Sequence, residues 1–162
     1  MFRPALRHES SGLSYTRKSM GKGEVFDVEK DFFIVKPGVT ASEMNHQLRE
    51  GRHLLFTPGM YTLEEPLHVV RKGTILLGLG YATLIPGEGC TTAILVDEVD
   101  GVSIASLMFD AHYSSHSLLQ VGPKTGSKVR HADNPTLLSD LFFRVGGFRS
   151  GRVNVDETVI IN

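Results

Sequence analysis

The chain of 162 residues contains no tryptophan and one cysteine, and its acidic and basic residues nearly balance, with a net charge of −1. The single thiol, Cys90, excludes a disulfide within the chain. The charge balance, with basic residues scattered along the sequence, disfavours nucleic acid as a partner. No apolar run approaches the ~18 residues of a membrane helix. We therefore expect a protein that binds neither nucleic acid nor membrane.

The N-terminal region also lacks regular patterns. Residues 1–8 mix apolar, basic and polar side chains and show no continuous apolar export signal. Residues 1–30 have no sustained period, which predicts an extended or disordered lead-in. With 41% hydrophobic residues, the chain has enough apolar material for a core, and the regular apolar runs place that core in one domain over residues 31–162.

What the sequence does contain is a repeated module of a short apolar strand, a polar corner and a second apolar strand. The copies cover residues 67–78, 94–110 and 118–144, and a further copy starts at Val153. Modules spaced ~20 to 40 residues apart, none of which can bury its own apolar face, indicate a solenoid whose coils stack into one core. Residues 102–110 and 138–144 are each expected to form one strand, and residues 153–162 a strand, a corner and a strand.

A helix is predicted before these modules, over about residues 40–50. Thr40 and Glu43 have the spacing of a capping box, in which side chains satisfy the free backbone amides at a helix start. Met44 and Leu48 lie four residues apart, on one face, and Gly51 suits the left-handed position that ends a helix. Such a helix can cover the open end of the first coil.

Residues 51–61, 73–86, 100–102, 107–111 and 140–147 resemble secreted microbial and fungal proteins of the pectate-lyase-like right-handed β-helix superfamily. The resemblance implies an all-β fold: a right-handed, single-stranded parallel β-helix of about three to four N-terminal coils. It also implies a secreted parent protein with polysaccharide as its partner, and glycoside hydrolysis ahead of β-elimination as its reaction. In longer relatives of this kind, further coils follow. We therefore expect the catalytic residues to lie beyond Asn162 and this portion alone to be inactive.

The expected stacking of the coils determines which residues lie beside each acidic residue. If residues 107–110 stack on residues 141–144, Phe109 and Phe143 point inward together and Asp110 lies beside Arg144. Glycosidases need two carboxylates at a defined separation, whereas this arrangement gives an ion pair. Two readings remain open: a solvated or structural pair, or a pair that faces a sugar cleft. Asp110 is therefore a weak candidate for a catalytic residue.

Asp140 is the other weak catalytic candidate. In the same register it stacks nearest Ser106, so it also lacks an acidic neighbour and is expected to cap a corner. Arg144 and Tyr113 are the candidates for carbohydrate binding. Because tryptophan is absent, Tyr81 and Phe148 are the other aromatic rings considered for stacking on sugars.

The histidines offer no metal site in the sequence. His112, His116 and His131 fall in segments expected to be loops, where we expect them to be solvated, and their spacing matches no zinc motif. Cys90 has no recognisable partner for catalysis. No metal and no cofactor are therefore expected.

The apolar residues 159–161 would leave an open sheet edge near Ile160. Such an edge favours aggregation, so we expect missing C-terminal coils or a partner to cover it. Three interpretations follow: the truncated N-terminal part of a polysaccharide hydrolase, with glucan considered as its substrate; a non-catalytic polysaccharide-binding or surface adhesion module; or a truncated gene product without function.

Overall fold

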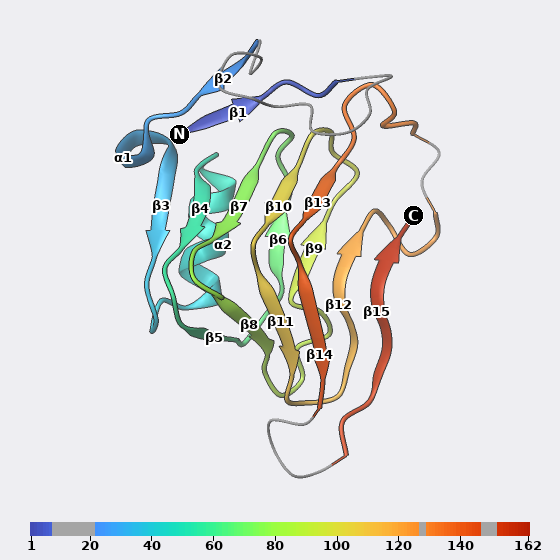
Figure 1. Ribbon diagram of the computed structural model, residues 1–162. Coiled ribbons are helices and arrows are strands. Elements are labelled where there is room, and N and C mark those ends of the chain that lie inside the picture. The colour runs from blue at the N-terminus through green and yellow to red at the C-terminus, as the bar shows by residue number, and fades with distance from the viewer. Residues whose placement is uncertain (8–21, 127–128, 147–151) are drawn as a thin grey trace. The chain divides into compact units, whose positions relative to one another are not determined.

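The computed structural model describes residues 1–7, 22–126, 129–146 and 152–162 (Figure 1). The chain divides into two compact units, Met1–Phe32 and Phe33–Asn162, which are described separately. The expected domain boundary near residue 30 stays a prediction.

The first unit contains a two-stranded antiparallel sheet and one short helix. Strand β1 (Phe2–Pro4) pairs with β2 (Gly23–Val25), and Arg3 forms an ion pair with Glu24 across the pair. Helix α1 (Val28–Asp31) starts after Asp27, whose carboxylate accepts hydrogen bonds from the backbone amides of the first turn. Part of the predicted lead-in, residues 8–21, lies outside the described residues.

The second unit contains three described sheets, in which the neighbouring strands from β4 onward pair in parallel. The first sheet is made of β3 (Phe32–Val35), β4 (His53–Phe56), β7 (Ile75–Gly78), β10 (Ser103–Ala105) and β13 (Leu137–Ser139). The second is made of β5 (Met60–Leu63), β8 (Thr83–Pro86), β11 (Met108–Ala111) and β14 (Phe142–Val145). The third is made of β6 (Leu67–Val69), β9 (Ile94–Val96), β12 (Ser115–Val121) and β15 (Val155–Ile161).

Strands that follow one another in the chain belong to different sheets. Strands β4, β5 and β6 lie in the first, second and third sheets, and β7, β8 and β9 repeat that order one layer further along (Figure 1). We call each such set of three successive strands a coil. Coils that stack with parallel pairing in every sheet form a parallel β-helix, so the predicted solenoid is confirmed at this level.

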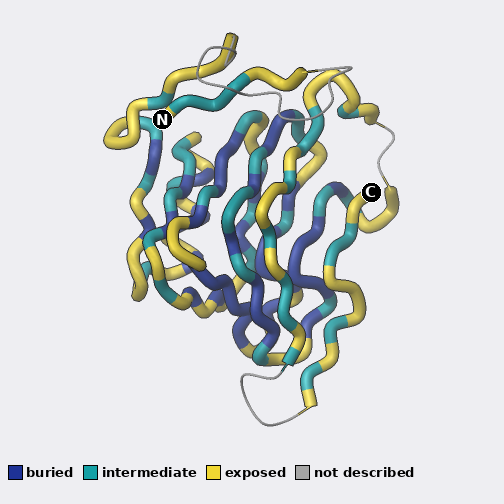
Figure 2. Tube along the Cα trace, viewed as in Figure 1, coloured by how far each residue is buried: buried dark blue, intermediate teal, exposed yellow. Residues whose placement is uncertain are grey.

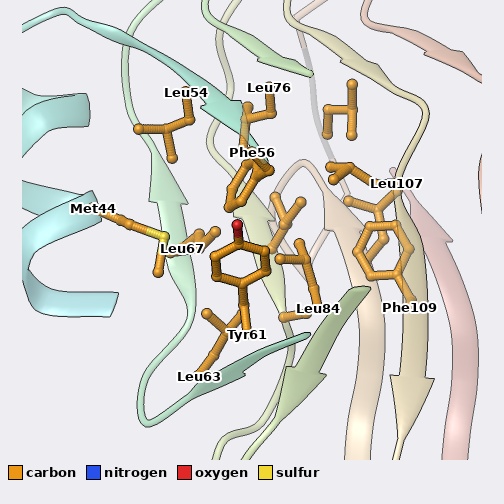
Figure 3. Close-up of a cluster of buried hydrophobic side chains, with 14 of the residues drawn as sticks. Met44, Leu54, Phe56, Tyr61, Leu63, Leu67, Leu76, Leu84, Leu107 and Phe109 are labelled. Carbon is orange, nitrogen blue, oxygen red and sulfur yellow. The ribbon is translucent and has the colours of Figure 1, made fainter. Parts of the chain in front are cut away.

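The core is built from ladders of inward-facing apolar side chains, one ladder for each sheet. Because side chains alternate across a strand, the register fixes which residues meet in the interior. The ladders are Leu54–Leu76–Ile104–Leu138, Tyr61–Leu84–Phe109–Phe143 and Leu67–Ile94–Leu119–Val159. Figure 2 shows the buried residues concentrated along these strands, and Figure 3 shows several of the side chains filling the interior.

The aromatic rings confirm the expected stacking. The ring of Phe109 stacks on that of Phe143, with centroids 4.7 Å apart and planes 13° from parallel. In the same ladder, Tyr61 makes an edge contact with Phe56 at 5.3 Å. Its hydroxyl donates to the backbone carbonyl of Val35. Tyrosine is therefore tolerated in the core because its polar end has a partner.

The predicted helix is confirmed as α2 (Ala41–Arg49). The Thr40 hydroxyl accepts a hydrogen bond from the Glu43 amide, as the capping sequence predicts. The helix packs against β4 and β6 of the first coil and buries Met44 and Leu48, and Figure 3 shows Met44 beside Leu67. After the helix, Gly51 has a φ of +90°, the left-handed conformation expected of it.

Three strand predictions are wrong. Residues 102–110 form two strands, β10 and β11, because Ser106 has a left-handed φ of 54° and turns the chain from the first sheet into the second. Asp140, with a φ of 51°, divides residues 138–144 in the same way. Residues 153–162 contain one continuous strand, β15, which pairs with the seven-residue strand β12 and therefore has no corner.

The coil made of β13, β14 and β15 is more exposed than the one beneath it. Its inward-facing residues Leu138, Phe143 and Val159 are half-buried, whereas their ladder neighbours on β10, β11 and β12 are fully buried (Figure 2). Ile160 is half-buried and Ile161 is exposed. Among the helices that the structure describes, none has the length and apolar character needed to cross a membrane.

Candidate functional site

The outer face of the second sheet carries the ion pair predicted from the stacking. Strand β11 pairs with β14 in a register that sets Asp110 beside Arg144, and the guanidinium Nη2 donates a hydrogen bond to Asp110 Oδ2. The carboxylate is fully buried, although the Arg144 side chain is 38% exposed. The predicted pair is thus confirmed, and the suggestion that it is solvated is wrong for the carboxylate.

His112 extends this pair. Its Nε2 lies 3.0 Å from Asp110 Oδ2, and its side chain is only 5% exposed, so the expectation of a solvated loop histidine is wrong here. The reason is that His112 directly follows β11, and side chains two residues apart along an extended chain lie on the same side. Asp110 Oδ1 is buried and has no hydrogen-bond partner among the described residues.

The other two histidines that were expected to lie in loops also contact aspartates. His116 Nδ1 lies 3.1 Å from Asp156, and His131 Nδ1 lies 2.6 Å from Asp100. His116 belongs to strand β12, so its assignment to a loop is wrong. Each of these contacts joins segments more than 30 residues apart in the sequence. They connect neighbouring layers of the solenoid.

The two partners change the ionisation of Asp110. Burial alone would raise the pKa of this carboxyl group, but the hydrogen bonds from Arg144 and His112 outweigh burial and hold the pKa of Asp110 below its usual value. The hydrogen bond to Asp110 in turn raises the pKa of Arg144. The lowered pKa keeps Asp110 charged. The proton donor of a glycosidase needs a raised pKa instead, so Asp110 does not suit that role.

The lowered pKa of Asp110 predicts that the folded protein loses stability at acidic pH. A carboxyl group whose pKa lies below the unfolded value of about 3.9 stabilises the fold above that pH and loses the contribution as pH falls through its folded pKa. We expect the thermal unfolding midpoint to fall from about pH 4 downward, and Asp110→Asn to flatten this fall. The measurement is the midpoint between pH 2.5 and 7. The exposed Asp133→Asn is the control and should keep the wild-type slope; an unchanged slope in Asp110→Asn would contradict the assignment.

Asp140 lies at the corner between the first and second sheets. It accepts a hydrogen bond of 2.9 Å from the Ser106 hydroxyl, one coil away, which confirms the predicted neighbour. Both residues have a left-handed φ, and so does Tyr81, at 60°, in the layer below. Neither Asp110 nor Asp140 has a hydrogen bond to another carboxylate among the described residues. The catalytic role considered for both stays a prediction.

A groove of about 320 Å³ runs along this corner. We call it the corner groove; it is lined by Gly78, Leu79, Gly80, Tyr81, Ser106, Leu107, Met108, Asp140 and Phe142. Tyr81 is 84% exposed and Phe142 is 61% exposed. Two accessible aromatic rings, a hydroxyl and a carboxylate therefore share one concave surface.

Of the aromatic residues considered for stacking on sugars, Tyr81 lines the corner groove, whereas the two main candidates for carbohydrate binding, Tyr113 and Arg144, do not. Tyr113 lies in the turn between β11 and β12 and is partly exposed, but it does not line the corner groove. The guanidinium of Arg144 is engaged by Asp110. Phe148 lies outside the described residues. Binding by Tyr113 and Arg144 stays a prediction. Phe142 was not among the candidates, although the alternation with inward-facing Phe143 indicates that it faces outward.

Cys90 is buried, and its thiol donates a hydrogen bond to the Thr92 carbonyl. Burial raises the pKa of this thiol, which favours the unreactive protonated form. Within the described ranges, no three His, Cys, Asp or Glu side chains are grouped so that they could hold a metal ion. Neither feature adds a reactive centre to the part of the chain that the structure describes.

Three sheets of stacked parallel strands define a parallel β-helix protein. The sequence profile of the LAM55 pectate lyase-like domain matches residues 32–162, so the chain belongs to this family. The resemblance identified from the sequence is thereby confirmed.

Relatives of known name share this region. An exo-beta-1,3-glucanase from Streptomyces sp. (strain SirexAA-E / ActE) is 41% identical over 167 residues, which cover 99% of this chain and 27% of the glucanase. The structure of sacteLam55A from Streptomyces sp. SirexAA-E superposes with a TM-score of 0.90 at 41% identity, over 99% of this chain and 28% of the other. A glutamate-to-alanine variant of sacteLam55A in complex with glucose gives a TM-score of 0.89, over 99% and 29%. The chain thus spans less than a third of the length of these relatives.

Proposed function

We propose that the chain is part of a glucan-directed carbohydrate-active protein whose parent reaction is the hydrolysis of β-1,3-glucan. One observation carries this proposal: nearly the whole chain aligns at 41% identity with a protein named exo-beta-1,3-glucanase. The proposal includes secretion of the parent protein, since a polysaccharide substrate is found outside the cell.

By itself, the chain binds polysaccharide without cleaving it. Hydrolysis of a glycosidic bond requires two carboxyl groups on opposite sides of that bond. In the described residues Asp110 is committed to Arg144 and His112, and Asp140 to Ser106, which supports the absence of turnover. A non-catalytic binding function is therefore the second candidate, and the same observation favours it for this portion of the protein.

The proposal extends to the architecture. The coils β4–β6, β7–β9, β10–β12 and β13–β15 wind in the right-handed sense and form the N-terminal coils of a longer solenoid. Half-buried Leu138, Phe143 and Val159, with exposed Ile161 beside them, support a covering layer over the last coil near Ile160. That layer is either further coils of the parent protein or a partner.

A replacement experiment tests the glucan-directed role. We expect the Streptomyces exo-beta-1,3-glucanase to keep hydrolysing laminarin, a β-1,3-glucan, when its matching segment is exchanged for residues 1–162 of this chain. The rate should stay within about tenfold of the parent rate, since the exchanged coils share their fold and 41% of their residues. The measurement is the release of reducing sugar.

Two controls accompany the exchange. The glucanase without the segment, and residues 1–162 alone, should both release no sugar. A folded hybrid that hydrolyses no β-1,3-glucan would contradict the proposed function, and turnover by residues 1–162 alone would contradict the absence of catalysis.

A further inference from the structure

We propose that the corner groove is a binding site for a β-glucan chain, with the rings of Tyr81 and Phe142 stacked on sugar faces and the Ser106–Asp140 pair bound to sugar hydroxyls. This inference rests on the proposed function and adds the place and the residues of glucan contact.

The groove is built across successive coils. Thr83, Met108 and Phe142 occupy one row of the second sheet, and Tyr81 precedes Thr83 by two residues. Neighbouring strands lie about 4.8 Å apart, so the coils that carry Tyr81 and Phe142 are separated by about 10 Å. This separation exceeds the width of one sugar ring, and it suits an oligosaccharide that runs along the solenoid rather than a monosaccharide.

The two rings are not accounted for by folding. Large aromatic side chains stabilise a protein when they are buried, yet Tyr81 and Phe142 leave most of their surface in water. Tyr81 also takes a left-handed φ of 60°, which glycine adopts at no steric cost. A glycine would adopt this backbone conformation with less strain, so the backbone conformation does not explain why a tyrosine occupies the corner.

The polar groups of the groove suit hydroxyl groups. Ser106 donates to Asp140 Oδ2, which leaves Asp140 Oδ1, without a hydrogen bond among the described residues, to accept from a ligand. A carboxylate accepts from the hydroxyls that sugars present in pairs, while aromatic rings cover the apolar C–H faces. Leu79 and Met108 add apolar surface between them.

Charge selects among polysaccharides. The lining residues include the anionic Asp140 and no lysine or arginine. An anionic chain such as polygalacturonate would meet a carboxylate with no cation to offset it, which is unfavourable. A neutral glucan meets no such repulsion, so the groove fits the neutral class.

Calorimetric titration of residues 1–162 with laminarihexaose, a neutral β-1,3-gluco-oligosaccharide, tests the site. Tyr81→Gly and Phe142→Ala are each expected to weaken binding about tenfold, as the loss of an aromatic anchor does. Tyr81→Gly removes the ring and relieves the left-handed backbone, so its fold should be at least as stable as the wild type. Val145→Ala, an exposed residue on the same strand as Phe142 but outside the groove, is the matched control and should bind like the wild type. Tyr113→Ala tests the other candidate aromatic residue, which lies outside the groove.

The outcomes distinguish the site from the proposed parent reaction. If the wild type binds but both groove variants bind equally well, or if Tyr113→Ala alone loses binding, the site is wrong and the function stands. Wild-type binding of polygalacturonate at comparable strength, or binding of no glucan, overturns both the site and the glucan binding proposed for residues 1–162, while an active hybrid glucanase would still support the parent reaction. An inactive hybrid would overturn the proposed function.

Discussion

Replacing Gly78 with alanine is expected to cost about 3 kcal/mol or more in the free energy of unfolding, at the upper end for an overpacked position. A Cβ atom at Gly78 would lie 2.1 Å from the backbone oxygen of Ser106 and 2.8 Å from a methyl carbon of Leu107. The backbone oxygen belongs to the corner of the next coil and cannot move without displacing β10 and β11. Thermal unfolding should report a midpoint lower by about 6 °C or more.

Gly73→Ala is the matched control for this substitution. Gly73 has a φ of +73°, and a Cβ there would meet nothing within 4 Å. The control therefore measures the conformational cost of a left-handed alanine, about 1–2 kcal/mol, without a steric clash. If Gly78→Ala is no more destabilising than Gly73→Ala, the close approach of the two coils at this corner is not as described.

Replacing Arg144 with methionine is the second substitution with a large expected effect. It removes the guanidinium and keeps a side chain of similar length over the sheet. The fully buried Asp110 carboxylate is left with His112 as its remaining partner. An uncompensated buried charge costs about 3 kcal/mol, part of which the protein recovers when the group takes up a proton.

A double-mutant cycle separates the charge from the packing. The variant that carries both Arg144→Met and Asp110→Asn has no buried charge at this position, so it should be more stable than Arg144→Met alone. The measurement is the free energy of unfolding of the four proteins in urea at pH 7. Additive effects of the two substitutions would contradict a direct interaction between the side chains.

The repeated modules made the stacking predictable because the interior of a solenoid imposes a simple rule. Inward positions must be apolar in every coil, so Phe109 and Phe143 could be aligned from the sequence, and Asp110 and Arg144 then followed as neighbours. The helix at residues 41–49 was predictable for a local reason, since its cap, its apolar face and its terminating glycine lie within a dozen residues of one another.

Two features could not be predicted from local patterns. The break at Ser106 depends on a left-handed conformation that serine rarely adopts, and Asp140 was expected to cap a corner but not to divide residues 138–144 into two strands. The burial of Asp110 depends on its contacts with His112 and Arg144. Both are properties of the assembled coils.

The corner groove could not be predicted for a related reason. Tyr81 and Phe142 are 61 positions apart, and they share a surface only because two further coils bring their corners into line. The predicted register already placed Phe143 inside, and by alternation Phe142 outside. What the sequence did not show is that the corner carrying Tyr81 lies in line with Phe142.

The central claim, that this chain is directed at neutral β-glucan, is tested most directly by electrophoresis of residues 1–162 through native gels that contain a dissolved polysaccharide. The account predicts slower migration in gels with laminarin, unchanged migration in gels with polygalacturonate, and no release of reducing sugar from either. Retardation by polygalacturonate, or migration that laminarin leaves unchanged, would contradict it.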